Sequence, residues 1–272
     1  MSWAKIMAPL SGGPSDLETL HAARALAAPF NAELAVAYAP ADAADLMPWM
    51  GEGFMGGVQV AALDSLKEAA EIGGRHAEEH YATIDYARKS FTTLAPPVAA
   101  GLAMEARLSD VVVFTTDPAR GRGPLVEAFQ QVLMEERRPV FVTRGPVSEI
   151  SGTVVVAWDG GREATRAARI AIPWLQKAAR VVILAAPAAT PRDFDPARLK
   201  EHFAERGVTA DVETLAHAGD PGPILLSAAL AAGADILVAG AFGHPRFQQF
   251  IFGGTTRHLM QAEVGPSLLL TH

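Results

Sequence analysis

The feature that most constrains the fold is an internal repeat, because the same series of apolar runs occurs twice along the 272 residues. In each half, an apolar run is followed by a glycine-containing turn, an alanine-rich helical pattern and three further runs. The matched pairs are Lys5–Leu10 with Thr153–Trp158, Ala32–Pro40 with Ala179–Pro187, Leu108–Thr116 with Gly233–Ala241, and Arg137–Gly145 with Val264–His272. Four landmarks in the same order indicate duplication.

Within each half the apolar runs alternate with helical patterns, which predicts βαβ units and a parallel sheet covered on both faces. The segment 145–152 has the glycine, proline and serine content of a connector. We therefore predict two tandem α/β domains of the open, doubly wound, Rossmann-like kind, at residues 1–145 and 152–272. The chain length suits two domains of ordinary size.

Three helices are predicted inside this frame. The first follows Asp159 and runs to about residue 178, with small and apolar residues at three- and four-residue intervals and Pro173 as a possible kink. The second begins at Asp220-Pro221 and runs to about residue 232. The third spans about Val60 to Tyr81.

Composition and charge exclude several classes of protein. No apolar run approaches the ~20 residues that span a bilayer, and no basic segment with a following apolar stretch opens the chain. We therefore expect a soluble cytoplasmic protein without a membrane partner. The absence of cysteine excludes disulfides and thiol chemistry. Residues 1–151 hold 12 basic and 19 acidic side chains, whereas residues 152–272 hold 11 of each. Nucleic acid is therefore not an expected partner, and the neutral half suits a polyanionic small molecule better.

The C-terminal half carries a spaced glycine motif. A buried strand is predicted at Ile236–Ala239 and stops at Gly240, and Gly243 follows. After nine intervening residues, Gly253-Gly254 stand where a helix would begin, with two threonines behind them. The free N–H groups of such a helix start suit a phosphate. A tight strand-to-helix connection, with glycines for turn geometry alone, is the alternative.

This spacing resembles the ATP-binding signature of the universal stress protein family. The resemblance is strong over residues 152–272 and topological over residues 1–145. It implies five parallel strands in each domain, with the nucleotide across their carboxyl ends. The implied ligand is ATP or ADP, and Mg²⁺ could enter with the phosphates. The resemblance also implies that the two halves form an intramolecular pseudo-dimer, and a homodimer is left open.

The resemblance further implies a set of nucleotide-contacting residues. The acidic residue that ends the first strand is matched by Asp159, after Ala157 and Trp158, and the main chain near Ala185 would recognise adenine. Around the ribose and phosphates it places Ala239, Gly240, Gly243, Gly253, Gly254, Thr255 and Thr256. At Gly254 many members of the family have serine. In the nine-residue loop, Arg246 either pairs with a terminal phosphate or is solvated, and His244 is more typical of a packed loop residue than of a base.

The first half departs from this pattern at two places. When Pro139 is aligned with Pro266, Val126-Glu127 stand opposite Gly253-Gly254, and a glutamate there would repel phosphate. Ser11 stands where the second half has Asp159. We therefore predict that residues 1–145 form a degenerate domain without a nucleotide. Its apolar loop, residues 41–57, either covers its own core or docks a partner.

The leading functional hypothesis is an ATP- or ADP-binding regulatory protein of the stress response. The predicted site has one carboxylate but no general base with an orienting partner, so no catalytic residue is assigned. An ATP-using enzyme is the second hypothesis, since Ser11–Asp16 resembles the SGGxDS loop of ATP pyrophosphatases. Ser15 and Asp16 are read more simply as a helix N-cap and a first-turn acid. The third is an interaction module that binds no nucleotide.

Overall fold

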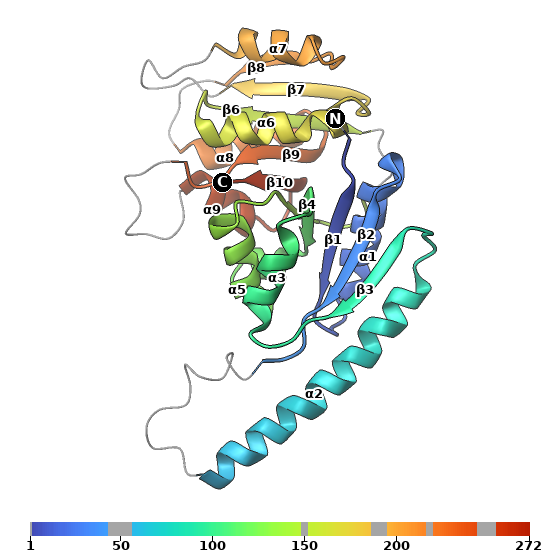
Figure 1. Ribbon diagram of the computed structural model, residues 1–272. Coiled ribbons are helices and arrows are strands. Elements are labelled where there is room, and N and C mark those ends of the chain that lie inside the picture. The colour runs from blue at the N-terminus through green and yellow to red at the C-terminus, as the bar shows by residue number, and fades with distance from the viewer. Residues whose placement is uncertain (1, 43–55, 148–151, 186–194, 216–219, 244–253) are drawn as a thin grey trace.

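The structure is a computed structural model. It describes residues 2–42, 56–147, 152–185, 195–215, 220–243 and 254–272, with the side chains of residues 56–60 left out. All ten strands join in one sheet that has helices on both faces (Figure 1). The α/β fold predicted from the repeat is confirmed.

The first half supplies the elements up to β5. They are β1 (Lys5–Leu10), α1 (Asp16–Ala27), a 3₁₀ turn (Ala28–Phe30), β2 (Glu33–Tyr38), α2 (Gly56–Thr83), β3 (Lys89–Thr93), α3 (Val98–Ala106), β4 (Val111–Phe114), α4 (Thr116–Ala119), α5 (Val126–Gln130), a π-helical turn (Gln131–Glu135) and β5 (Val140–Val142).

The second half repeats this order with fewer helices among its described residues. It comprises β6 (Thr153–Trp158), α6 (Arg162–Leu175), β7 (Arg180–Ala185), α7 (Pro196–Ala204), β8 (Asp211–Thr214), α8 (Pro221–Ala231), β9 (Ala234–Gly240), α9 (Gly254–Gln261) and β10 (Ser267–Thr271).

The sheet order is β3-β2-β1-β4-β5-β10-β9-β6-β7-β8, so each half contributes five strands in the same relative order. Within each half every described pairing is parallel. The halves meet at β5 and β10, which pair antiparallel with Phe141 opposite Leu269. The two five-stranded sheets that the sequence implies are therefore fused into one.

The duplication extends to side-chain detail at the amino ends of the strands. The Asp110 carboxylate accepts the N–H of Lys5 at 2.9 Å, at the start of β1. In the second half, the carboxylate of Asp235 accepts the N–H of Thr153 at 2.8 Å, at the start of β6. Matched aspartates thus hold the first strand of each half beside its fourth.

Hydrophobic cores lie on both faces of the sheet. One contains buried residues of α1, α6 and α7, together with Ala77 of α2, and the other contains buried residues of α3, α4, α5, α8 and α9. Within β6, Val154 and Val156 belong to the first core and Val155 to the second. This alternation is what a strand buried on both faces requires.

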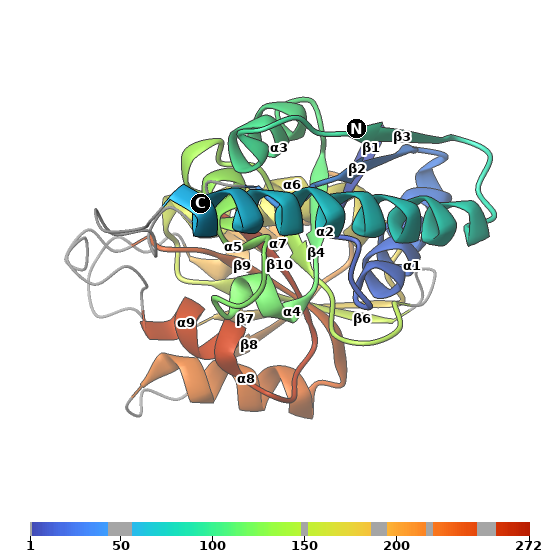
Figure 2. The same cartoon turned by 90° about the horizontal axis from the view of Figure 1, so that it is seen from below.

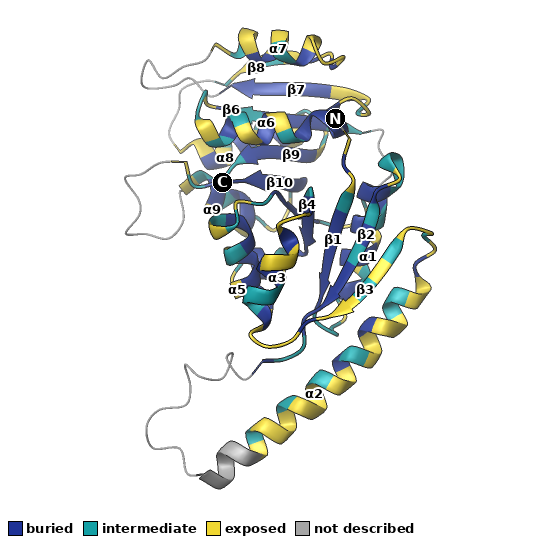
Figure 3. Ribbon diagram, viewed as in Figure 1, coloured by how far each residue is buried: buried dark blue, intermediate teal, exposed yellow. Residues whose placement is uncertain are grey.

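The helix α2 is the main departure of the first half from the shared pattern. Figure 2 shows it stretched along one side of the molecule, and Figure 3 shows exposed residues along most of its length. It begins earlier and ends later than predicted. The described part of the chain contains no helix that is both long enough and apolar enough to cross a membrane.

Candidate functional site

The residues expected around the nucleotide end neighbouring parallel strands. Asp159 follows the last residue of β6, Trp158, which lies in register with Ala185 at the end of β7. On the other side of β6, Ala239 and Gly240 end β9. The carboxyl ends of these strands therefore lie at one edge of the sheet, where ligands of doubly wound folds bind.

Asp159 is exposed, and its carboxylate accepts the N–H of Gly161 at 2.8 Å. The contact folds the carboxylate over the turn that precedes α6, in which Gly160 has a φ of 72°. Trp158 and Ala185 are buried beside it, and Ala157 is half-buried. The acid thus stands at the surface of an otherwise apolar strand edge.

One of the motif glycines has a packing reason. A Cβ at Gly240 would lie 2.5 Å from the main-chain nitrogen of Ala164, so this glycine lets the end of β9 approach the first turn of α6. A Cβ at Gly243 would lie 2.7 Å from a carboxylate oxygen of Glu163, which is the end of a flexible side chain. The alternative that the sequence left open, glycines for a tight connection, therefore explains Gly240.

Gly254 differs, because a Cβ placed there would meet no atom of the described residues within 4 Å. It is the first residue of α9 and is exposed. Since the protein leaves this position open, its main chain is accessible from outside. Thr255 is half-buried behind it.

Thr256 is engaged inside the protein. It is 6% exposed, and its hydroxyl oxygen accepts the N–H of Phe242 at 3.5 Å. Phe242 has a φ of 60°, which is unusual for a side chain of its size. Thr256 thus ties the first turn of α9 to the segment after β9. His244, Arg246 and Gly253 lie outside the described residues.

The matched loop of the first half is closed by a buried carboxylate. Asp16, 2% exposed, accepts the N–H groups of Ser11 at 3.0 Å and Gly12 at 2.8 Å. Burial raises the pKa of this carboxyl, against the lowering effect of the two N–H groups. Ser15 occupies the N-cap position, as expected, but its side chain makes no capping hydrogen bond. Because Asp16 already occupies the loop amides, the geometry does not favour the pyrophosphate-loop alternative.

The helix α2 covers the same place. Tyr38 ends β2 in register with Leu10, as Ala185 ends β7 in register with Trp158. The Tyr38 hydroxyl donates to the carbonyl of Ala70 in α2 at 2.7 Å. A Cβ at Gly12 would lie 2.3 Å from the Cα of Gly73, so α2 lies directly against the loop. Sequence reasoning missed this contact, because nothing in the sequence relates Gly12 to Gly73.

The helix of the first half that matches α9 also begins without a glycine. The helix α5 begins at Val126 with Glu127 in its first turn, near the point at which alignment placed the start of α9. The Glu127 carboxylate accepts a hydrogen bond from the side chain of Gln131 at 3.0 Å. The helix starts of the two halves are therefore equivalent in position, but the first turn of α5 is acidic and that of α9 begins with three uncharged residues.

A cavity of about 210 Å³ lies elsewhere, at the amino ends of β6, β9 and β10. Its lining includes Arg144, Trp174, Asp235 and Ser267. It is smaller than a typical ligand pocket and lies at the opposite edge of the sheet from Asp159 and Gly254. We therefore do not assign the candidate site to it.

The comparison with protein families decides what the second half is. Residues 151–263 match the model of the universal stress protein family. They form a universal stress protein domain. The resemblance read from the glycine spacing is therefore confirmed for this half. No curated protein matches the chain.

Solved structures extend the likeness of fold to the whole chain. A universal stress protein from Archaeoglobus fulgidus aligns with a TM-score of 0.66 at 14% identity, covering 98% of this chain and 95% of its own. A Pseudomonas aeruginosa UCBPP-PA14 protein described as a putative universal stress protein aligns at 0.55 and 15%, covering 99% and 93%. A functionally unknown protein of P. aeruginosa PAO1 aligns at 0.55 and 14%, covering 99% and 92%. At these identities the likeness concerns the fold, which both halves share.

Proposed function

We propose that the C-terminal half binds an adenine nucleotide, ATP or ADP, and that the protein acts as a nucleotide-binding regulator in the stress response. The observation that carries the proposal is the contrast between matched positions of the two halves. In the first half Asp16, Tyr38 and α2 fill the strand edge. In the second half Asp159 is exposed, and the small residue Ala185 occupies the position in β7 that matches Tyr38 in β2.

The residues present fit such a ligand. The open position at Gly254 lets a phosphate approach the free N–H groups of α9, where the helix dipole favours an anion. Asp159 would accept hydrogen bonds from ribose hydroxyls, and the main chain near Ala185 would meet the adenine. In this assignment Mg²⁺ would accompany the phosphates, since it keeps several waters and needs few protein ligands.

The proposed role is binding rather than catalysis. Asp159 is an exposed acidic side chain of the candidate site, and its described contact is a main-chain N–H. General acid–base catalysis would need a base held by an orienting partner. We therefore assign no catalytic residue.

The variant Asp159→Ala tests the proposal. Loss of a hydrogen bond to a charged group costs about 1.5–3 kcal/mol, which is roughly ten- to hundredfold in ATP affinity. A loss that appears only when Mg²⁺ is present would assign Asp159 to the metal rather than to the ribose. Calorimetric titration with ATP, with and without Mg²⁺, distinguishes the two.

A matched control is available in Asp195→Ala. The Asp195 carboxylate accepts the N–H of Ala197 at 2.8 Å, the same contact that Asp159 makes with Gly161, but at the start of α7. Asp195 is the N-cap of α7, so its removal should cost about 1 kcal/mol of stability. Asp159→Ala loses the corresponding contact in the turn before the N-cap of α6. Equal ATP affinity in the two variants would show that Asp159 only orders the turn before α6 and would remove it from the site.

A further inference from the structure

Two arginines of the first half hold the far end of α9. Arg120 follows α4 and donates to the carbonyls of Met260 at 3.3 Å and Ala262 at 2.7 Å. Arg144 follows β5 and donates to the carbonyls of Leu259 and Met260. Its guanidinium also reaches the carbonyl of Pro266 at 3.2 Å.

The carbonyls of Leu259 and Met260 are among those that a helix leaves without partners. The last four C=O groups of an α-helix have no intrahelical donor, and they carry the negative end of the dipole. Two guanidinium groups there satisfy the acceptors and complement the charge. In the described part of the chain neither arginine forms an ion pair with a carboxylate. The end of α9 is thus their main polar partner.

Arg144 is held in this place at some electrostatic cost. Burial, and then the neighbouring charge of Arg120, lowers its pKa to about 10, which still leaves it charged at neutral pH. A Cβ at Gly265 would lie 2.7 Å from a guanidinium nitrogen of Arg144, so the C-terminal half leaves room for the side chain. The contact is therefore built by residues of both halves.

The location of Arg120 relates the contact to the duplication. In the second half, the segment after β9 leads to the glycine start of α9, whereas in the first half the matched segment after β4 carries α4 and Arg120. The segment that lost its phosphate glycines thus provides a cation for the helix that kept them. The helix α9 is only eight residues long, and short helices depend on tertiary contacts.

We infer that Arg120 and Arg144 are positioning residues for nucleotide binding: by holding the carboxyl end of α9, the degenerate half fixes its amino end, Gly254-Thr255, where the phosphates would bind. This inference rests on the proposed function. It gives the first half a role in binding although it takes no nucleotide itself.

The test uses the full chain with Arg120→Met and Arg144→Met combined, which keeps the apolar stems and removes every donor. The readout is the ratio of ATP affinity to adenosine affinity. If α9 positions the phosphates, this ratio should fall about fivefold or more, at the low end of typical coupling between sites. General destabilisation would instead lower both affinities alike, and an unchanged ratio would overturn the inference.

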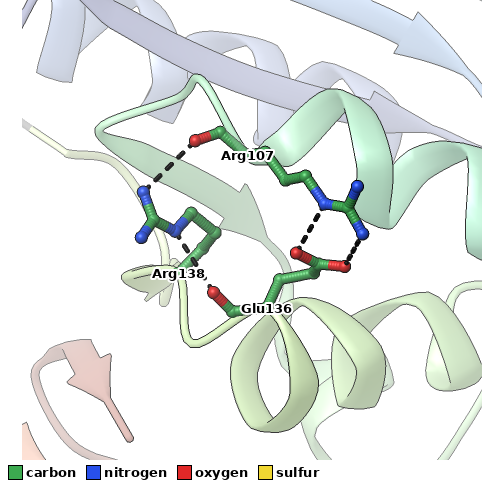
Figure 4. A network of polar contacts seen from close by, with 3 residues as sticks. All are labelled: Arg107, Glu136 and Arg138. Atoms are coloured by element: carbon green, nitrogen blue, oxygen red, sulfur yellow. Dashed lines mark hydrogen bonds and ion pairs between the residues drawn. The ribbon is translucent and has the colours of Figure 1, made fainter.

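Two further variants sharpen the readout. Arg144→Lys keeps a charge and a donor at the helix end, so it should restore much of the ratio. Arg107→Gln breaks the paired contacts of 2.7 Å each that Arg107 makes with Glu136, inside the first half (Figure 4). It should leave the ratio unchanged. If the double variant does not fold, Arg120→Met alone is compared with Arg107→Gln in the same way.

Hydrogen exchange separates this inference from the proposed function. Amides of residues 254–262 should exchange faster in the double variant than in the wild type, whether or not nucleotide is present. Unchanged exchange there would contradict the claim that the two arginines hold α9 in place. A wild-type protein that binds neither ATP nor adenosine would overturn the proposed function, and the role of these arginines in binding would fall with it.

Discussion

At the scale of single residues, the glycines of one motif serve two different purposes. Gly240 lies against the backbone of α6, whereas Gly254 faces open space. The sequence shows their spacing but not which neighbour each one meets. A Cβ at the first would press on main-chain atoms that cannot move aside, and a Cβ at the second would meet nothing.

We therefore predict opposite effects for two substitutions. Gly240→Ala should lower the free energy of unfolding by about 1–3 kcal/mol, the usual cost of overpacking. Gly254→Val should leave stability nearly unchanged but weaken ATP binding about tenfold or more, because its side chain would block phosphate from the helix N–H groups. Urea denaturation and ATP titration measure the two effects. A Gly254→Val variant with normal ATP affinity would place the phosphates elsewhere.

The buried carboxylate of Asp16 leads to a prediction about how the stability of the protein depends on pH. Burial raises its pKa above the ordinary value of 3.8. The folded protein therefore binds this proton more tightly than the unfolded chain does, so ionisation of Asp16 lowers the free energy of unfolding as the pH rises. Relative to Asp16→Asn, which cannot ionise, the wild type should lose stability as the pH rises from the ordinary pKa of 3.8 through the raised pKa of the folded protein. A difference that stays constant or grows over this range would contradict the assignment.

At the scale of elements, the helix α2 closes the first half. Tyr38 and Asp16 are buried beneath it, and Gly12 and Gly73 let it approach the loop after β1. The variant Tyr38→Phe removes the hydrogen bond to Ala70 and should cost about 1 kcal/mol of stability. It should leave ATP affinity unchanged, since the proposed function places the nucleotide in the second half. A change in affinity with the fold intact would show that this edge takes part in binding.

The elements also show what could be read from the sequence. The apolar runs predicted as strands became β1, β2, β4 and β5 and their counterparts β6, β7, β9 and β10, and α6 and α8 begin near the residues expected. The strands β3 and β8 had no such signal, because they lie at the two edges of the sheet and most of their residues are exposed or half-buried. Edge strands need no apolar run, and polar side chains there discourage further pairing.

The candidate site was only partly readable for a related reason. The family resemblance placed Asp159, Ala185 and Gly240 around one ligand, and the strand register puts all three at one edge of the sheet. The contacts that distinguish the halves join residues far apart in the chain, such as Gly12 with Gly73 and Arg144 with Leu259. Because such pairs follow from packing rather than from local pattern, no motif announces them.

At the scale of the whole molecule, duplication produced two equivalent edges in one sheet, each formed by the carboxyl ends of the strands of one half. The antiparallel pairing of β5 with β10 joins them, and Arg120 and Arg144 add polar contacts across the junction. One edge is filled by the protein's own carboxylate and helix, and the other presents Asp159 and the start of α9. The two halves thus share a fold but differ in what their edges can accept.

The number of ATP sites per chain tests this account most directly. Calorimetric titration of the wild-type protein with ATP should give one site per chain, and Asp159→Ala should weaken that site while Tyr38→Phe leaves it intact. Two equivalent sites, or a single site that responds to Tyr38→Phe and not to Asp159→Ala, would contradict the account.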